Sequence, residues 1–217
     1  MKYFKLILLL VMIVTSTSNI YAKDIEYTNT NNGIIQIGSK VFWTYFNGSG
    51  FLKPNGNSHQ LYCNLELYSN GNLKQYALNL SLETDRWKNI YAYAFPCESK
   101  ILLKLKDESI LELTSIYHSD ITIPTETTYW SVSSRARFPI TEEQLKKCFK
   151  GIKKIRVEVI TLDEESNIIV KKHVDKDFKK DKLGKNLDKW FIEINKELEA
   201  ILAKIQSNKN TNINDNF

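Results

Sequence analysis

Between residues 34 and 174, alternation of apolar with other residues is the dominant pattern, and it constrains the fold more than any other feature. The segment from Gln60 to Tyr68 shows it most clearly, with Leu61, Cys63, Leu65 and Leu67 separated by other residues. Successive side chains of a β-strand point to opposite faces, so such a strand packs one face on a core and exposes the other. We therefore expect an α+β chain that is mainly antiparallel β, either a sandwich or a strongly curved sheet.

Turn signals separate the expected strands. Asn70-Gly71 predicts a tight hairpin, because both residues accept positive φ. Lys106-Asp107-Glu108 predicts a second hairpin, and the polar segment 163–166 predicts a third turn. The expected strands cover residues 41–46, 60–68, 73–82, 101–105, 109–118, 129–138, 152–162 and 167–174.

Two helices are expected in addition to the strands. Thr141 and Gln144 have the spacing of a capping box, in which each side chain bonds the backbone N–H of the other residue, so a short helix is expected near 141–150. Beyond residue 184, apolar residues recur at steps of three and four, which predicts a long C-terminal helix near 185–206. Its apolar stripe consists of Leu187, Trp190, Phe191, Ile194, Leu198, Ile201, Leu202 and Ile205.

The stripe of the long helix has two interpretations. It resembles a heptad seam, which would join two copies of the chain in a homodimeric coiled coil. However, Trp190 and Leu202 make it wider than such a seam, so packing on one face of the β-sheet is favoured. The charged segment 175–182 predicts a solvated linker or a first helical turn, and the Asn-rich segment 207–217 predicts a disordered tail.

The first 22 residues have the layout of a cleavable secretory signal. Lys2 and Lys5 precede the apolar run 6–14, a more polar stretch follows, and Ala22 offers a small residue for cleavage. The apolar run is far shorter than the roughly 20 residues that a membrane-spanning helix needs. The first cysteine is Cys63, which argues against a lipoprotein. We expect an exported protein, periplasmic or extracellular and soluble after cleavage, with a β-rich domain at 23–175 and the helix at 176–206.

Charge and cysteine content exclude several classes of protein. Removing the signal leaves 28 basic against 25 acidic residues, a weak bias that gives no argument for nucleic acid. Three cysteines, Cys63, Cys97 and Cys148, allow at most one disulfide within the chain, and an odd thiol remains. Their spacing fits neither a redox motif nor a zinc site.

Part of the chain resembles a known group of sequences. The segments LLKLKDESILEL (102–113) and RFPITEEQLKKCFKGIKKIRVEV (137–159) are similar to a pattern in small exported proteins of Bacteroides-like bacteria, most of them uncharacterised. The shared features are structural: a hairpin, a capped helix and a Lys-Ile-Arg strand. The pattern has Gly after Asp107, where this chain has Glu108. The resemblance implies an envelope location and no particular activity.

No catalytic, cofactor or metal motif stands out. His59, His118 and His173 lie far apart in the sequence, whereas a metal site needs several converging ligands. There is no Gly-x-Ser-x-Gly elbow. Glu112, Glu158 and Asp163 are acids for an alternative interpretation, a hydrolase acting on envelope or dietary polymers. We therefore expect no cofactor and no metal, and favour a non-enzymatic binding or envelope-associated module.

The candidate ligand-binding residues lie on strands with exposed polar faces. Arg135 and Arg137 share a face with Tyr129, and a guanidinium fork suits a carboxylate or an anionic sugar. Tyr91 and Tyr93 alternate, so they could share that face and stack on a sugar ring, or could belong to the core. A solvated face with cross-strand ion pairs is the alternative. The expected partner is a glycan, a peptide or another envelope protein, with a homodimer through the C-terminal helix as a further alternative.

Overall fold

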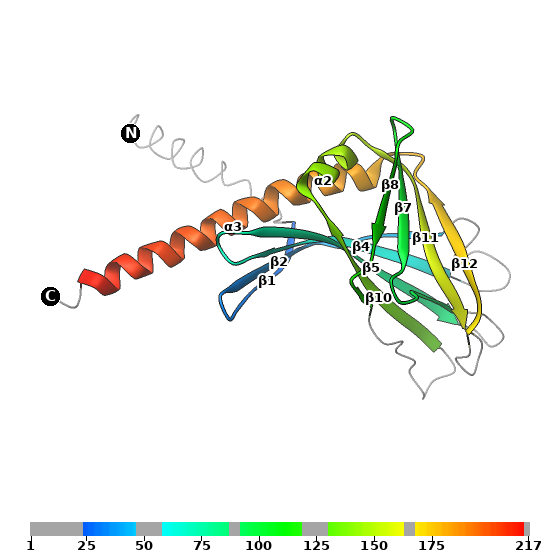
Figure 1. Cartoon of the computed structure of the whole chain (residues 1–217), viewed down its shortest axis with the longest axis horizontal. Coiled ribbons are helices and arrows are strands. Elements are labelled where there is room, and N and C mark those ends of the chain that lie inside the picture. Colours follow the sequence, from blue (N-terminus) through cyan, green and yellow to red (C-terminus); the bar gives the residue numbers. More distant parts are fainter. Residues whose placement is uncertain (1–23, 47–57, 87–91, 119–129, 163–167, 215–217) are drawn as a thin grey trace, which may run out of the picture.

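The structure is a computed structural model that describes residues 24–46, 58–86, 92–118, 130–162 and 168–214. The expected signal peptide therefore lies outside the described residues. The chain is mainly antiparallel β with one short helix and one long C-terminal helix, as the sequence predicts (Figure 1). The strands are β1 (Ile25–Asn31), β2 (Ile34–Ser39), β3 (Phe42–Tyr45), β4 (Ser58–Ser69), β5 (Lys74–Arg86), β6 (Ala92–Ala94), β7 (Lys100–Leu105), β8 (Ile110–Thr114), β9 (Tyr117–His118), β10 (Trp130–Ile140), β11 (Ile152–Leu162) and β12 (Ile168–Asp177). The helices are α2 (Glu142–Phe149) and α3 (Lys182–Asn214).

The strands form two antiparallel sheets. Sheet A has the order β1-β2-β4-β5-β10-β9, and β3 also pairs with β4. Sheet B has the order β12-β11-β7-β8, and β6 also pairs with β11. The long strands β4, β5 and β10 form the centre of sheet A. Strand β5 pairs with β4 from Lys74 to Asp85 and with β10 from Tyr76 to Arg86.

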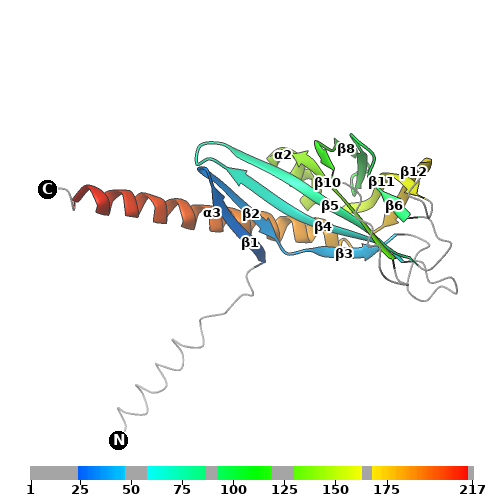
Figure 2. The same ribbon diagram turned by 90° about the horizontal axis from the view of Figure 1, so that it is seen from below.

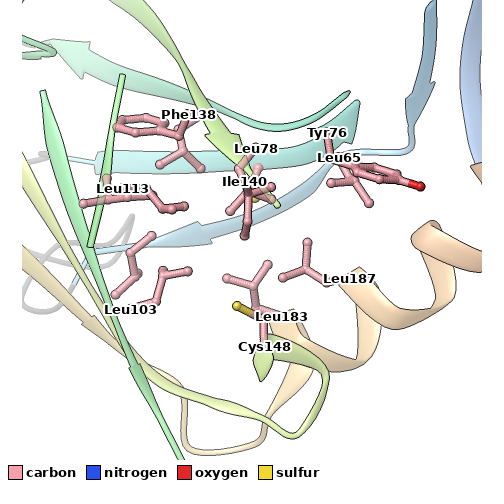
Figure 3. Packing of buried hydrophobic residues seen from close by; sticks show 14 of the residues in the cluster. Leu65, Tyr76, Leu78, Leu103, Leu113, Phe138, Ile140, Cys148, Leu183 and Leu187 are labelled. Atoms are coloured by element: carbon pink, nitrogen blue, oxygen red, sulfur yellow. The ribbon is translucent and has the colours of Figure 1, made fainter. Parts of the chain in front are cut away.

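The core lies between the two sheets and the helices. Figure 3 shows Leu78 and Phe138 of sheet A, Leu103 of sheet B and Leu183 of α3 pointing toward one another. The predicted inward residues of β4 are buried, namely Leu61, Cys63, Leu65 and Leu67. The predicted inward residues of β10 whose side chains the structure describes are also buried, namely Val132, Ser134, Ala136 and Phe138. Two sheets therefore share one core, which favours the packed-sheet form of the prediction over a single curved sheet.

Helix α2 follows its sequence signature. The Thr141 Oγ1 accepts a hydrogen bond from the Gln144 backbone N–H at 3.2 Å, and the Gln144 Oε1 accepts one from the Thr141 N–H at 2.9 Å. Glu142 and Glu143 occupy the first turn, where acids complement the helix dipole. Leu145 and Cys148 are buried on its inner side, so the short helix closes one end of the core.

Helix α3 packs the first part of its apolar stripe on sheet A and α2. Leu187, Trp190, Ile194 and Leu198 are buried, and the helix contacts α2, β1, β2 and β4. It continues to Asn214, beyond the expected end near 206, and this part extends past the strands in both views (Figures 1 and 2). No Gly or Pro interrupts residues 203–214, and each added residue gains one helical hydrogen bond. The tail expected over 207–217 is therefore helical as far as Asn214, and 215–217 lie outside the described residues.

The segment before α3 is more ordered than a solvated linker. Strand β12 runs to Asp177, because Asp175 and Asp177 lie opposite Arg156 and Lys154 of β11. The Arg156 Nε donates to Asp175 Oδ1 at 2.7 Å, and its Nη2 donates to Asp175 Oδ2 at 2.9 Å. This fork holds the pKa of Asp175 at about 2. The buried Asp181 carboxylate then accepts hydrogen bonds from the backbone N–H groups of Ile152 and Gly184 at 3.1 and 3.2 Å.

The hairpins predicted at Asn70-Gly71 and at Lys106-Asp107-Glu108 both form, but the backbone conformation of the first turn differs from the one expected. Gly71 has a φ of +91°, but Asn70 does not have positive φ; its Oδ1 instead accepts from the N–H groups of Asn72 and Leu73. Glu108 has a φ of +68°, which is the conformation that glycine adopts most easily. The segment 109–118 divides into β8 in sheet B and β9 in sheet A.

Cys63 and Cys148 are buried thiols, Cys97 is exposed, and the described cysteines form no disulfide with one another. Burial raises the pKa of both the Cys63 and the Cys148 thiols to about 12. Among the residues that the structure describes, no helix combines the length and the apolar character needed to cross a membrane.

Candidate functional site

The outer face of sheet A, which points away from the core, carries a cluster of polar side chains around Glu66. Because Leu65 and Leu67 point inward, Glu66 of β4 points outward, yet its side chain is only 5% exposed. In the sheet register, Tyr27 lies opposite Gly38, Gly38 opposite Glu66, and Glu66 opposite Ala77. The small residues on each side of Glu66 leave space for larger side chains to lean over the carboxylate.

Gly38 determines where the Tyr27 side chain lies. A Cβ built on Gly38 would stand 2.3 Å from Cε1 of the Tyr27 ring, closer than any real contact between such atoms. The ring therefore lies directly on the Gly38 backbone, and its hydroxyl reaches across β2 to donate to Glu66 Oε1. A glycine in the interior of a strand often marks such a close approach.

Both oxygens of the Glu66 carboxylate accept hydrogen bonds from tyrosines. Tyr27 donates to Oε1, and Tyr68 donates to Oε2. The Gln36 Nε2 in turn donates to the Tyr68 hydroxyl at 3.0 Å and to the Tyr27 hydroxyl at 3.3 Å. Burial, and then the hydrogen bond to Glu66, raise the pKa of both tyrosines, so they remain neutral donors. We call Tyr27, Gln36, Glu66, Tyr68 and Arg137 the Glu66 cluster.

Arg137 is the cation of the Glu66 cluster. Its Nε lies 3.5 Å from Glu66 Oε2 and donates to Asn79 Oδ1 at 3.3 Å. The guanidinium carbon lies over two aromatic rings, 4.9 Å from the Tyr68 centroid and 5.7 Å from the Tyr117 centroid. The side chain is 33% exposed, and no described residue accepts a hydrogen bond from its Nη nitrogens. One edge of the guanidinium is thus fixed in place, and the terminal edge is available to a ligand.

A groove of about 730 Å³ runs beside this guanidinium. It lies between the β4–β5 turn, the end of β10 and the start of α2. Arg137 and Tyr68 line it together with six aliphatic or proline residues, namely Ile34, Leu73, Ala77, Ile116, Pro139 and Ile140. The volume lies within the range of small-molecule sites. The Glu66 cluster therefore borders a hollow large enough for a ligand.

The structure separates the residues that the sequence brought together as a site. Arg137 belongs to the Glu66 cluster and the groove, whereas Arg135 is exposed on the same strand and is not part of the groove lining. Tyr93 does not share their face, because it belongs to β6 of sheet B and its ring stacks on that of His59. Tyr129 and Tyr91 lie outside the described residues.

Tyr93 is part of a second polar cluster, inside the molecule. Its ring stacks on that of His59 with centroids 3.8 Å apart, and Lys172 Nζ lies 4.6 Å from the Tyr93 centroid. The His59 Nδ1 lies 3.1 Å from Thr84 Oγ1. Burial, and then the charge of Lys172, lower the pKa of His59 to about 4, so this histidine is neutral at ordinary pH.

Two of the three acids of the hydrolase interpretation, Glu112 and Glu158, pair with lysine side chains. The Glu112 carboxylate pairs with Lys100 Nζ at 2.8 Å. The buried Glu158 pairs with Lys171 and accepts a hydrogen bond from the Lys100 backbone N–H at 3.1 Å. Asp163 lies outside the described residues. Among the described residues, no three His, Cys, Asp or Glu side chains converge as metal ligands would.

Sequence reasoning missed Tyr27, Gln36, Glu66 and Tyr68. A charged residue at an outward position of a strand is usually solvated, so Glu66 carried no signal of its own. The one available hint was Gly38 within an apolar-alternating strand, which indicates close approach of another group.

A scan against models of protein families matches none, and comparisons with curated proteins and with solved structures find no match either.

Proposed function

We propose that this chain is an exported, non-enzymatic binding protein whose ligand contacts the groove on sheet A, with Arg137 recognising an anionic group. The observation that supports it is the orientation of Arg137. Its Nε is held by Glu66 and Asn79, while no described residue accepts a hydrogen bond from its Nη nitrogens at the groove. A guanidinium with its outer edge available suits a carboxylate, which it binds through two parallel hydrogen bonds.

The surroundings of Arg137 favour binding over catalysis. Both Glu66 oxygens already accept hydrogen bonds from tyrosine hydroxyls, so this carboxylate positions Arg137 and Tyr68 instead of meeting a substrate. Tyr68 and Tyr117 support the guanidinium through their ring faces, an arrangement that limits its motion and lowers the entropy lost when a ligand binds. These contacts support the proposal of a pre-organised anion receptor.

Titration with anionic probes tests this function. The probes are galacturonate, a short peptide with a free C-terminal carboxylate, and decanoate, each followed by calorimetry. We expect at least one probe to saturate, and Arg137→Gln to weaken it at least tenfold, because the charge-assisted pair is lost. Arg156→Gln, which removes the same charge from sheet B, is the matched control and leaves binding unchanged. Binding that is equal in all three proteins, or the absence of binding by every probe, would exclude the proposal.

Assembly of two copies through α3 is the second proposal. Leu187, Ile194 and Leu198 are buried within the molecule, but Ile205, farther along the same apolar stripe of α3, is 37% exposed. Light scattering tests it: a dimer that dissociates on Ile205→Lys supports assembly, and a monomer at high concentration excludes it.

A further inference from the structure

We infer that the ligand of the groove is a medium-chain fatty acid, with its carboxylate on Arg137 and its alkyl chain along the apolar wall. This inference rests on the proposed function and names the class of ligand. It separates an alkyl carboxylate from an anionic sugar, which offers the same charge to Arg137 but a polar body to the rest of the groove.

The apolar wall is made by aliphatic side chains from three separate segments. Ile34 of β2 is 49% exposed, Leu73 of the β4–β5 turn 66%, and Ile116 next to β9 72%. A single exposed aliphatic residue is ordinary on a protein surface. Three that line one groove beside an available guanidinium give this groove both apolar lining and one cation, a combination that complements an amphiphile.

The polar side chains of the groove are mostly engaged within the protein. Lys74 Nζ and the Tyr76 hydroxyl donate to Asn195 Oδ1 at 2.9 and 3.0 Å. Thr141 and Gln144 are engaged in the capping box of α2, and Glu142 pairs with Lys146.

The turn residues of the lining are engaged as well. Ser69 Oγ and Asn70 Oδ1 accept hydrogen bonds from the backbone of the β4–β5 turn. Apart from the Nη groups of Arg137, the lining side-chain donors that no described residue engages are the amide nitrogens of Gln75, Asn70 and Gln144. A sugar ring would also place hydroxyls against the exposed aliphatic side chains, where a buried hydroxyl without a partner is costly. A single carboxylate head needs only the guanidinium of Arg137, and an alkyl chain makes no such demand on the aliphatic side chains.

The test compares probes that separate charge from chain. Hexanoate, octanoate and decanoate are titrated below their aggregation concentrations, with decanol and glucuronate as the matched probes that lack the charge or the chain. We expect affinity to rise roughly two- to fourfold for each added CH₂ group that enters the groove. Decanol and glucuronate should each bind at least tenfold more weakly than decanoate.

Three variants locate the site on the protein. Arg137→Lys keeps the positive charge but removes the guanidinium that can form two parallel hydrogen bonds to a carboxylate. It should weaken decanoate binding at least fivefold. Leu73→Ser, at an exposed position, should weaken decanoate and leave hexanoate nearly unchanged. Ile110→Ser is the control, since Ile110 is 65% exposed on β8 of sheet B. Circular dichroism checks that each variant is folded.

The outcomes separate this inference from the function beneath it. Galacturonate or glucuronate binding that depends on Arg137, without decanoate binding, would overturn the fatty-acid inference and leave the binding function in place. Decanoate binding that is unaffected by Arg137→Lys and Leu73→Ser would show adsorption elsewhere and overturn the fatty-acid inference. If no sugar or peptide probe binds through Arg137 either, the binding function is overturned as well. Chain-length dependence that disappears with Leu73→Ser supports the inference.

Discussion

The close contact between Gly38 and Tyr27 gives a prediction whose size follows from the structure. In Gly38→Ala, the new methyl group would lie 2.3 Å from Tyr27 Cε1, so the ring must move away. The Tyr27 hydroxyl then loses its hydrogen bond to Glu66, and the Glu66 carboxylate becomes more exposed to solvent on that side. A hydrogen bond to a charged group contributes about 1.5–3 kcal/mol. Alanine recovers roughly 0.5–1 kcal/mol of the backbone entropy that glycine loses within a strand. We expect a net destabilisation of about 1–2 kcal/mol.

Urea unfolding of four proteins measures this effect: wild type, Gly38→Ala, Tyr27→Phe and the double variant. Because both changes break the same hydrogen bond, Tyr27→Phe should cost about 1.5–3 kcal/mol alone and much less in the Gly38→Ala background. β-propensity by itself predicts the opposite sign, since alanine is favoured over glycine in a strand. A Gly38→Ala protein as stable as wild type, with additive effects in the double variant, would refute the reasoning.

Three further predictions follow from other parts of the chain. The pKa of His59 is lowered from 6.5 to about 4, so the neutral form stabilises the fold. The contribution of neutral His59 to the free energy of unfolding is complete above pH 6.5 and is lost as the pH falls toward 4, by at most about 3 kcal/mol. His59→Gln should therefore flatten this part of the pH–stability curve. A curve that His59→Gln leaves unchanged would contradict the assignment. Thr141→Ala should cost about 1 kcal/mol by removing the cap of α2, whereas Thr114→Ala at an exposed position of β8 should cost little; equal costs would count against the capping argument. If residues 1–22 are a signal, the exported form in a bacterial host should begin at Lys23 by N-terminal sequencing, and an intact Met1 in that fraction would argue against it.

The fold was largely predictable because its signals are local. Alternation identified the strands and the inward face of β4, the Thr141–Gln144 spacing identified α2, and the apolar steps from Leu187 to Leu198 identified the face of α3 that packs on the sheet. The end of β12 was missed because its last residues are charged. Asp175 and Asp177 are extended because of Arg156 and Lys154 on a neighbouring strand, which no local window contains.

The site was predictable only in Arg137. The other members of the Glu66 cluster come from β1, β2 and β4. The order of strands in sheet A brings these strands near β10, and a period-two pattern does not contain that order. The alternation of Tyr93 left both a ligand-binding face and the core open, and the pairing of β6 with β11 in sheet B places its ring against His59. Convergence of distant strands is a tertiary property, so the Glu66 cluster required the structure.

A crystal structure with the tightest-binding carboxylate probe tests the central claim most directly. We predict that the carboxylate lies about 2.7–2.9 Å from the Nη nitrogens of Arg137, with the probe extending into the groove past Leu73. Arg137 should keep its Nε toward Glu66 and Asn79. A carboxylate bound away from Arg137, in a crystal where the groove is open to solvent, would contradict the account.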